Sequence, residues 1–144
     1  MKPQRNIKIK YLPGATKMKQ EKRSDWIDCY CYEDVALKAG EYGYINLGFA
    51  CELPEGYEAH LAPRSSTFKH FGVIQTNSFG IIDSTFKSSE DIWMMPVYAL
   101  RDTEIKAGER PCQFRIMEIQ PTISFQEVAD LDNETRGGFG SSGK

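Results

Sequence analysis

The sequence has few of the residues from which metal centres and disulfide frameworks are built. Its 144 residues include four cysteines and two histidines. The nearest cysteines, Cys29 and Cys31, are separated by a single residue, Tyr30. The sequence contains no Cys-x-x-Cys pair. We therefore expect no structural zinc site, and free thiols in a reducing cytoplasm.

Long apolar runs and an excess of one charge are also missing. Hydrophobic residues make up 40% of the chain, yet no stretch approaches the ~20 apolar residues of a membrane helix. No apolar run follows the first five residues, so we expect no secretory signal. With 18 basic and 20 acidic residues, the formal charge is -2, unlike that of proteins with a strongly basic face for nucleic acid. We expect one soluble domain that binds neither membrane nor nucleic acid, and a small anionic ligand fits this charge.

Most apolar residues follow a period of two, which is typical of strands with one buried face. The pattern predicts strands at residues 7–11, 42–46, 57–61 and 112–116, separated by turns such as Pro13-Gly14 and Pro54-Glu55-Gly56. One short helix is predicted at residues 65–71, with Ser65 or Ser66 as its cap and Gly72 at its end. Many short strands with frequent turns indicate an antiparallel sandwich or barrel.

Two short segments carry groups that suit anion chemistry. Backbone N–H groups at the predicted helix start attract anions, and Arg64 precedes them directly. A simple helix cap beside a surface arginine is the alternative. Asp83 follows the apolar run Gly80-Ile81-Ile82, where a carboxylate at a strand end can act as general base on a water. An ordinary turn aspartate is the alternative there.

The last nine residues, 136–144, include four glycines. Residues 138–144 match the Gly-x4-Gly-Lys pattern of a phosphate-binding loop, but the strand that must precede such a loop is not predicted. We therefore reject a nucleotide-kinase function. The glycine backbone, the serines and Arg136 could still donate hydrogen bonds to a polyphosphate, with Phe139 as a flat face for a base. A disordered tail is the alternative.

Five segments, taken together and in order, resemble the five motifs of the trimeric dUTPase family, the dUTP nucleotidohydrolases. The likeness extends from about Asp25 to Lys144 and is closest to enzymes of Gram-positive bacteria and their phages. The fifth segment is the most specific one. The segments are Asp28-Cys-Tyr-Cys-Tyr-Glu-Asp-Val, Ala62-Pro-Arg-Ser-Ser, Gly80-Ile-Ile-Asp-Ser-Thr-Phe-Lys, Gly108-Glu-Arg-Pro-Cys-Gln-Phe and Arg136-Gly-Gly-Phe-Gly-Ser-Ser-Gly.

This resemblance implies an all-β fold, a jelly-roll-like barrel of short strands with one short helix. It implies a homotrimer whose active sites are shared between subunits. Residues 1–135 would form the barrel domain, and residues 136–144 a flexible arm that closes the active site. The implied reaction is water attack at the α-phosphorus of dUTP, which gives dUMP and pyrophosphate. Such an enzyme limits uracil in DNA and supplies dUMP for dTMP synthesis.

The resemblance also implies roles for individual residues. Asp83 matches the acid that activates the water. Asp28 matches an acid that contacts a hydrated Mg²⁺, which the triphosphate itself mainly holds. The implied substrate-binding residues, in chain order, are Arg64, Ser65, Ser66, Asn77, Gly80, Ile82, Phe86, Gln113, Arg136, Phe139, Gly140, Ser141 and Ser142.

The sequence departs from the family pattern at a few positions and leaves two other functions open. Phe86 stands where the family usually has tyrosine, Ser88 replaces a glycine, and Pro111 replaces an aliphatic residue. A dCTP deaminase of the same fold is one alternative, although it would need a catalytic glutamate in the third segment. A phage regulatory module that binds a repressor protein is the other.

Overall fold

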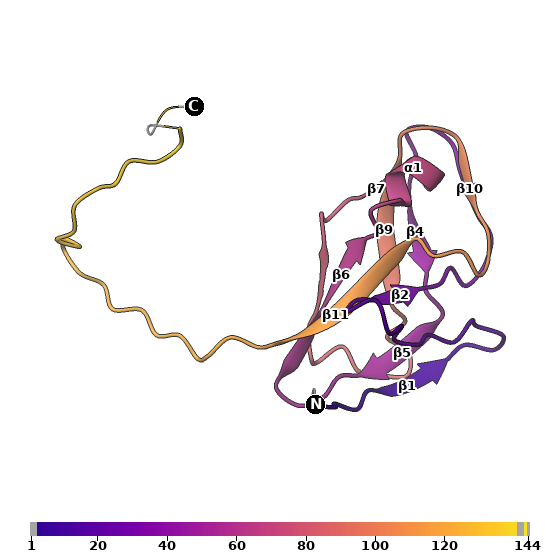
Figure 1. Ribbon diagram of the computed structural model, residues 1–144, viewed down its shortest axis with the longest axis horizontal. Coiled ribbons are helices and arrows are strands. Elements are labelled where there is room, and N and C mark those ends of the chain that lie inside the picture. The colour runs from indigo at the N-terminus through magenta and orange to yellow at the C-terminus, as the bar shows by residue number, and fades with distance from the viewer. Residues whose placement is uncertain (1–2, 141–142, 144) are drawn as a thin grey trace.

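Short antiparallel strands make up most of the body of the protein (Figure 1). The computed structural model describes residues 3–140 and residue 143. Within that part of the chain lie eleven strands and one helix: β1 (Lys8–Tyr11), β2 (Ile27–Cys29), β3 (Val35–Leu37), β4 (Tyr42–Asn46), β5 (Phe49–Glu52), β6 (Tyr57–Pro63), α1 (Thr67–Phe71), β7 (Val73–Gln75), β8 (Gly80–Ile82), β9 (Met94–Ala99), β10 (Thr103–Ile105) and β11 (Cys112–Glu118). The prediction of an all-β fold with one short helix is confirmed.

The strands pair into four antiparallel sheets. The largest has the order β2-β11-β6-β8, the next has the order β4-β9-β7, and β1-β5 and β10-β3 form two-stranded ladders. The paired strands of the described chain do not join into one closed barrel. The four-stranded sheet matters most for function, because its strands β2, β6, β8 and β11 carry or border four of the five segments singled out in the sequence.

The core lies between the sheets and contains a cluster of aromatic rings in tilted and edge-to-face contact. Trp93 packs against Phe49 and Phe114, with ring centroids 4.8 Å and 5.2 Å apart. Along β6, Ala59 and Leu61 are buried while their neighbours are only half-buried, as the alternating pattern predicts. All four cysteines are buried and free, as the sequence analysis expected.

Helix α1 begins at Thr67, two residues later than predicted, and ends before Gly72. Ser66 occupies the cap position, as predicted, but its side chain makes no capping hydrogen bond. The physical reason is its backbone (φ -97°, ψ -1°), which is not in the extended region that capping residues use. Gly72 has φ 64°, and a Cβ there would lie 2.5 Å from Cγ of Arg101, so this end of the helix requires glycine.

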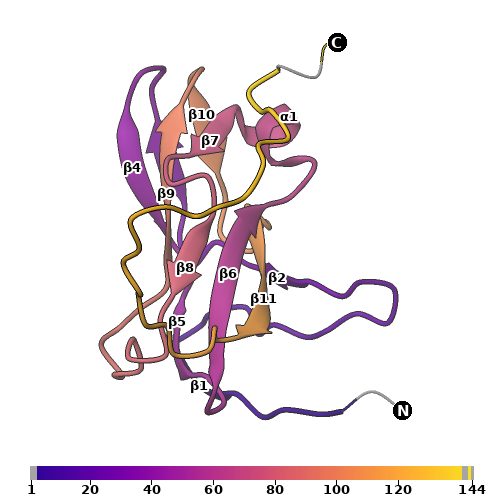
Figure 2. The ribbon, with the colours of Figure 1, turned by 90° about the vertical axis from the view of Figure 1, so that its left-hand side faces the viewer.

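An extended arm leaves the body after β11 (Figures 1 and 2). The backbone N–H of Ile119 still donates to the carbonyl of Gly56, at 3.0 Å. Residues 120–140 are exposed and form neither helix nor strand. Among the described residues, no helix is long and apolar enough to cross a membrane.

Candidate active site

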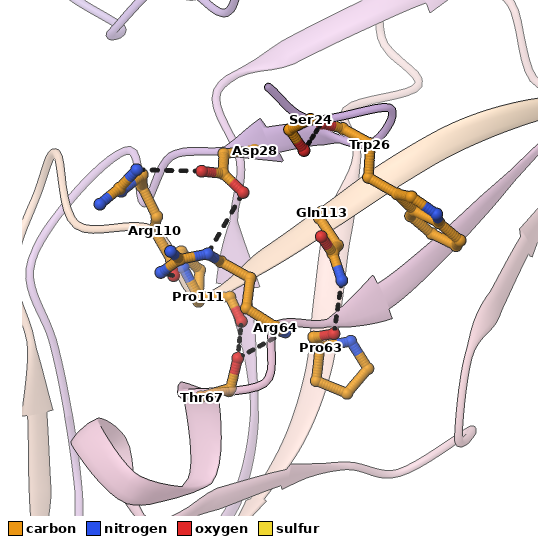
Figure 3. Close-up of polar contacts among 9 residues, drawn as sticks. All are labelled: Ser24, Trp26, Asp28, Pro63, Arg64, Thr67, Arg110, Pro111 and Gln113. Atoms are coloured by element: carbon orange, nitrogen blue, oxygen red, sulfur yellow. Dashed lines mark hydrogen bonds and ion pairs between the residues drawn. The ribbon is translucent and has the colours of Figure 1, made fainter. Parts of the chain in front are cut away.

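Asp28 lies between two arginines that come from different segments of the chain (Figure 3). Its Oδ1 is 3.2 Å from Nε of Arg64, which follows β6, and its Oδ2 is 3.0 Å from Nη1 of Arg110, which precedes β11. The carboxylate side chain is only 24% exposed. We call these three residues the arginine–aspartate cluster. It joins the first, second and fourth segments and carries one net positive charge, which suits an anionic ligand.

Hydrogen bonds from β6, α1 and β11 hold this cluster in place (Figure 3). The Thr67 hydroxyl accepts from the backbone N–H of Arg64 at 2.7 Å and donates to the carbonyl of Pro111 at 2.8 Å. The Gln113 amide donates to the carbonyl of Pro63 at 3.1 Å. Because Thr67 is buried, its hydroxyl ties the second segment to the fourth without competition from bulk water.

The turn between β6 and α1 presents Ser65 and Ser66 beside Arg64. Ser65 is exposed and Ser66 is half-buried. Helix α1 has only five residues, so its dipole contributes little to anion binding. The hydroxyls, backbone N–H groups and arginines of this region are therefore its main donors.

The third segment borders a cavity of about 470 Å³. The walls come from β4, β6, the turn before β8, β8 itself, the loop that follows it and the start of β9. The predicted residues that line this cavity are Asn77, Gly80, Ile82, Asp83 and Phe86. We call it the hairpin cavity. Its mixture of aromatic, aliphatic and amide groups suits a flat heterocycle with a sugar attached.

Asp83 stands at the exposed end of β8, on the rim of the hairpin cavity. Its Oδ1 accepts a hydrogen bond from the backbone N–H of Thr85 at 2.8 Å. This bond, with a smaller contribution from the Thr85 hydroxyl, holds the pKa of Asp83 below its ordinary value. The carboxylate is therefore ionised at neutral pH and can accept a proton.

The described arm residues do not contribute to the walls of the hairpin cavity in their own chain. Arg136, Phe139 and Gly140 are exposed, and no residue of 119–140 lines the hairpin cavity. Phe139 has φ 50° and Gly140 has φ 87°, so the chain turns sharply at the predicted base-stacking residue. Ser141 and Ser142 lie outside the described residues.

Three residues that support the site were not identified as such in the sequence: Arg110, Thr67 and Gln75. Arg110 lies inside the fourth segment, but no role was predicted for its side chain. Thr67 lies in the predicted helix, and Gln75 lies in a segment for which no strand was predicted. The local pattern does not indicate their partners Pro111 and Leu61, which lie 44 and 14 residues away. For metals, the described residues contain no group of three or more His, Cys, Asp or Glu side chains that could hold an ion.

Comparison with known proteins gives consistent results. The family model of dUTPase matches residues 18–143. The chain is 56% identical to an SPbeta prophage-derived deoxyuridine 5'-triphosphate nucleotidohydrolase of Bacillus subtilis, over 95% of this chain and 97% of that protein. It is 32% identical to a deoxyuridine 5'-triphosphate nucleotidohydrolase of Helicobacter hepaticus, over 96% of this chain and 89% of that protein.

Solved structures share the fold at lower sequence identity. A mutant dUTPase of Staphylococcus bacteriophage 80alpha with dUpNHpp superposes with a TM-score of 0.79 at 21% identity, covering 96% of this chain and 99% of that one. A mutant dUTPase from phage phi11 of S. aureus, described with a structural Mg(II) ion, gives a TM-score of 0.75 at 17% identity. That match covers 89% of this chain and 99% of the phage chain.

Proposed function

The chain belongs to the dUTPase family and hydrolyses dUTP, and on this premise we propose how its residues divide the work. The hairpin cavity holds the deoxyuridine, and the arginine–aspartate cluster faces the triphosphate. The observation that carries this proposal is the meeting of Asn77, Gly80, Asp83 and Phe86 at one cavity. We also place the reaction in the cytoplasm, where four free thiols stay reduced.

Asp83 is the proposed general base. Its ionised carboxylate takes a proton from a water as the water oxygen attacks the α-phosphorus. The bond from that phosphorus to the bridging oxygen breaks, and pyrophosphate leaves with the electron pair. The low pKa of Asp83 keeps the base unprotonated at neutral pH, although it also makes the base a weak one. Alignment and charge stabilisation therefore supply most of the rate.

The phosphates bind to Arg64, Ser65, Ser66 and Gln113 in this proposal. Arg64 is paired with Asp28 in the free protein, so the triphosphate competes with that carboxylate for the guanidinium. Arg110 keeps its own ion pair with Asp28 and so holds the carboxylate when Arg64 turns to the substrate. Fixed donors of this kind stabilise the charge that builds up on the leaving phosphates.

The residues present fit a Mg²⁺ ion that the substrate brings. Asp28 is the carboxylate of the arginine–aspartate cluster, and both of its oxygens already face arginines. Such a carboxylate suits contact with the hydrated ion through water better than direct ligation. When bound, Mg²⁺ neutralises charge on the triphosphate, and Asp28 orients its water shell.

Selection of the base and sugar falls to the hairpin cavity. Asn77 and the backbone near Gly80 and Ile82 offer hydrogen bonds to the edge of uracil. Phe86, which is 40% exposed, packs against the deoxyribose and leaves no room for a 2′-hydroxyl. A tight wall rejects the methyl group of thymine by steric overlap.

The arm acts in a neighbouring subunit of a homotrimer, as we propose. The arm carries two large apolar side chains, Phe125 and Leu131, which are 96% and 76% exposed. Apolar side chains as exposed as these are typical of surfaces that a partner covers. The arm also runs clear of its own body in Figure 1. Residues 136–144 then close over the neighbour's site: Arg136 reaches the terminal phosphate, Phe139 stacks on uracil, and Gly140, Ser141 and Ser142 add donors.

Two variants test the assignment of the base. We expect Asp83→Asn to release no pyrophosphate from dUTP with Mg²⁺ while still binding dUpNHpp in calorimetry. Asp91 is the matched control, because it accepts a backbone N–H from Ser88 at 2.9 Å in the same loop. Asp91→Asn should keep most of the activity. If Asp83→Asn turned over at the wild-type rate, the base would have to be another group.

A nucleotide panel of dUTP, dTTP, dCTP and UTP separates the remaining alternatives. Pyrophosphate should appear from dUTP alone, whereas ammonia from dCTP would indicate a deaminase. A repressor protein as an additional partner is a second candidate, because the 80alpha phage dUTPase is described as controlling transfer of virulence genes. Capture of a repressor that dUpNHpp displaces would support it, and no captured repressor would count against it.

A further inference from the structure

Gln75 places a buried amide directly behind the hairpin cavity. It is the last residue of β7 and only 6% exposed. Its Nε2 donates one hydrogen bond to the carbonyl of Leu61 at 3.0 Å and another to Oδ1 of Asn77 at 2.9 Å. Leu61 and Asn77 both line the cavity, whereas Gln75 does not. Gln75 therefore acts on the cavity through Asn77.

These two bonds determine how the Asn77 amide is oriented. A backbone carbonyl only accepts, so Gln75 must turn its NH2 toward Leu61. The second hydrogen of the same NH2 points to Asn77, which must therefore present its oxygen to Gln75. The NH2 of Asn77 is left to face elsewhere. It lies beside Gly80 of the cavity wall, where a Cβ would be 3.4 Å from Nδ2.

The backbone of Gln75 also supports the turn that holds Asn77. The N–H of Ser78 donates to the carbonyl of Gln75 at 3.1 Å, and that of Phe79 donates to the carbonyl of Asn77 at 2.7 Å. Ser78 has φ 64°, which makes the turn tight. With the turn fixed from both sides, the Asn77 amide has little freedom to move away from the cavity.

The amide oxygen of Gln75, in contrast to its NH2, lowers the stability of the fold. Among the described residues, its Oε1 is buried without a hydrogen-bond partner. A buried oxygen of this kind lowers stability, and an apolar side chain would avoid the loss. The pair of NH2 bonds is what glutamine provides at this position.

We propose that Gln75 is a positioning residue for base selection, which orients Asn77 so that its NH2 faces the C4 substituent of the pyrimidine. Uracil carries an oxygen acceptor at C4, and cytosine carries an amine there. An NH2 donor held in place bonds the first and meets a second donor in the other. This inference rests on the proposed deoxyuridine site in the hairpin cavity.

The test compares kcat/KM for dUTP and dCTP in the wild type and in Gln75→Met. Methionine has a similar length and no donor, so Asn77 becomes free to rotate. We expect the dUTP-to-dCTP ratio to fall about tenfold or more. Ile74→Met on the same strand is the control, because Ile74 is 45% exposed and outside these hydrogen bonds. It should leave the ratio unchanged.

A double-mutant cycle shows whether Gln75 acts through Asn77. Asn77→Ala, at an exposed position, should lower the ratio as far as Gln75→Met does, and the double variant should lower it no further. If Asn77→Ala left the ratio at the wild-type value, the proposal would be overturned even if Gln75→Met failed to fold. An equal further loss in the double variant would overturn it too. Failure of the proposed function is distinct, because the wild type would then release no pyrophosphate from dUTP.

Discussion

Replacing Thr67 with valine tests the hydrogen bonds that join the second segment to the fourth. The Thr67 hydroxyl accepts from Arg64 at 2.7 Å and donates to Pro111 at 2.8 Å, and the residue is 1% exposed. Valine has nearly the same shape as threonine, so it creates no cavity. It removes the hydroxyl and leaves one N–H and one carbonyl without their partner.

The magnitude follows from those two groups. Each polar group that is left unpaired in a buried setting costs about 1–3 kcal/mol, and the extra buried methyl returns about 1 kcal/mol. We therefore expect Thr67→Val to lower the free energy of unfolding by about 1–5 kcal/mol, with a central value of about 3 kcal/mol. Thr67→Ser is the matched control. It keeps the hydroxyl and loses one methyl, which costs about 1 kcal/mol.

Urea denaturation at one fixed protein concentration measures both variants, since an oligomer's stability depends on concentration. The KM for dUTP is a second readout, because the backbone N–H of Arg64 loses its hydrogen bond to the Thr67 hydroxyl and this arginine is then held less firmly. The KM should rise for valine and stay near the wild-type value for serine. A valine variant as stable as the serine variant would refute the reasoning, since the hydroxyl would then contribute nothing.

Three further outcomes follow from other parts of the molecule. Arg110→Met should raise the KM for dUTP about two- to fivefold in steady-state assays, because it removes a partly exposed ion pair with Asp28. Arg110→Lys keeps the charge and should recover part of this loss. Deleting residues 136–144 should lower kcat/KM for dUTP at least ~100-fold and leave the melting temperature unchanged in calorimetry. Burial raises the pKa of Cys31 to about 11 from 9.0, so stability present below pH 9.0 should be lost as the pH rises toward 11. Urea titration across this pH range measures the loss, and Cys31→Ala should flatten it.

The alternating segments were predictable because they are long enough to show their period. Residues 57–61 and 112–116 became the seven-residue strands β6 and β11. Strands β2, β3, β7, β8 and β10 have three residues each, too few for a period of two to be seen. Their positions depend on partners distant in the chain. Helix α1 also begins later than predicted because of a distant partner. Its first residue, Thr67, donates a hydrogen bond to the carbonyl of Pro111.

The candidate site could be predicted where its residues touch substrate in the family that the sequence resembles. Asn77 and Asp83 were identified in this way, and they do border one cavity. Arg110, Thr67 and Gln75 could not be found in this way, because each has a hydrogen-bond partner 14 or more residues away, namely Asp28, Pro111 and Leu61. Neither composition nor local pattern contains that information.

The pairing of Asp28 with two arginines has a consequence for turnover. In the resting enzyme Asp28 acts as a built-in competitor for Arg64. In the proposed phosphate-binding role of Arg64, a triphosphate offers that guanidinium more oxygens than a single inorganic phosphate does, and so competes better with Asp28. Once the chain of phosphates is cut, each fragment holds Arg64 less strongly than the intact substrate did. The carboxylate can then take its arginine back, which favours departure of the products and resets the enzyme for the next nucleotide.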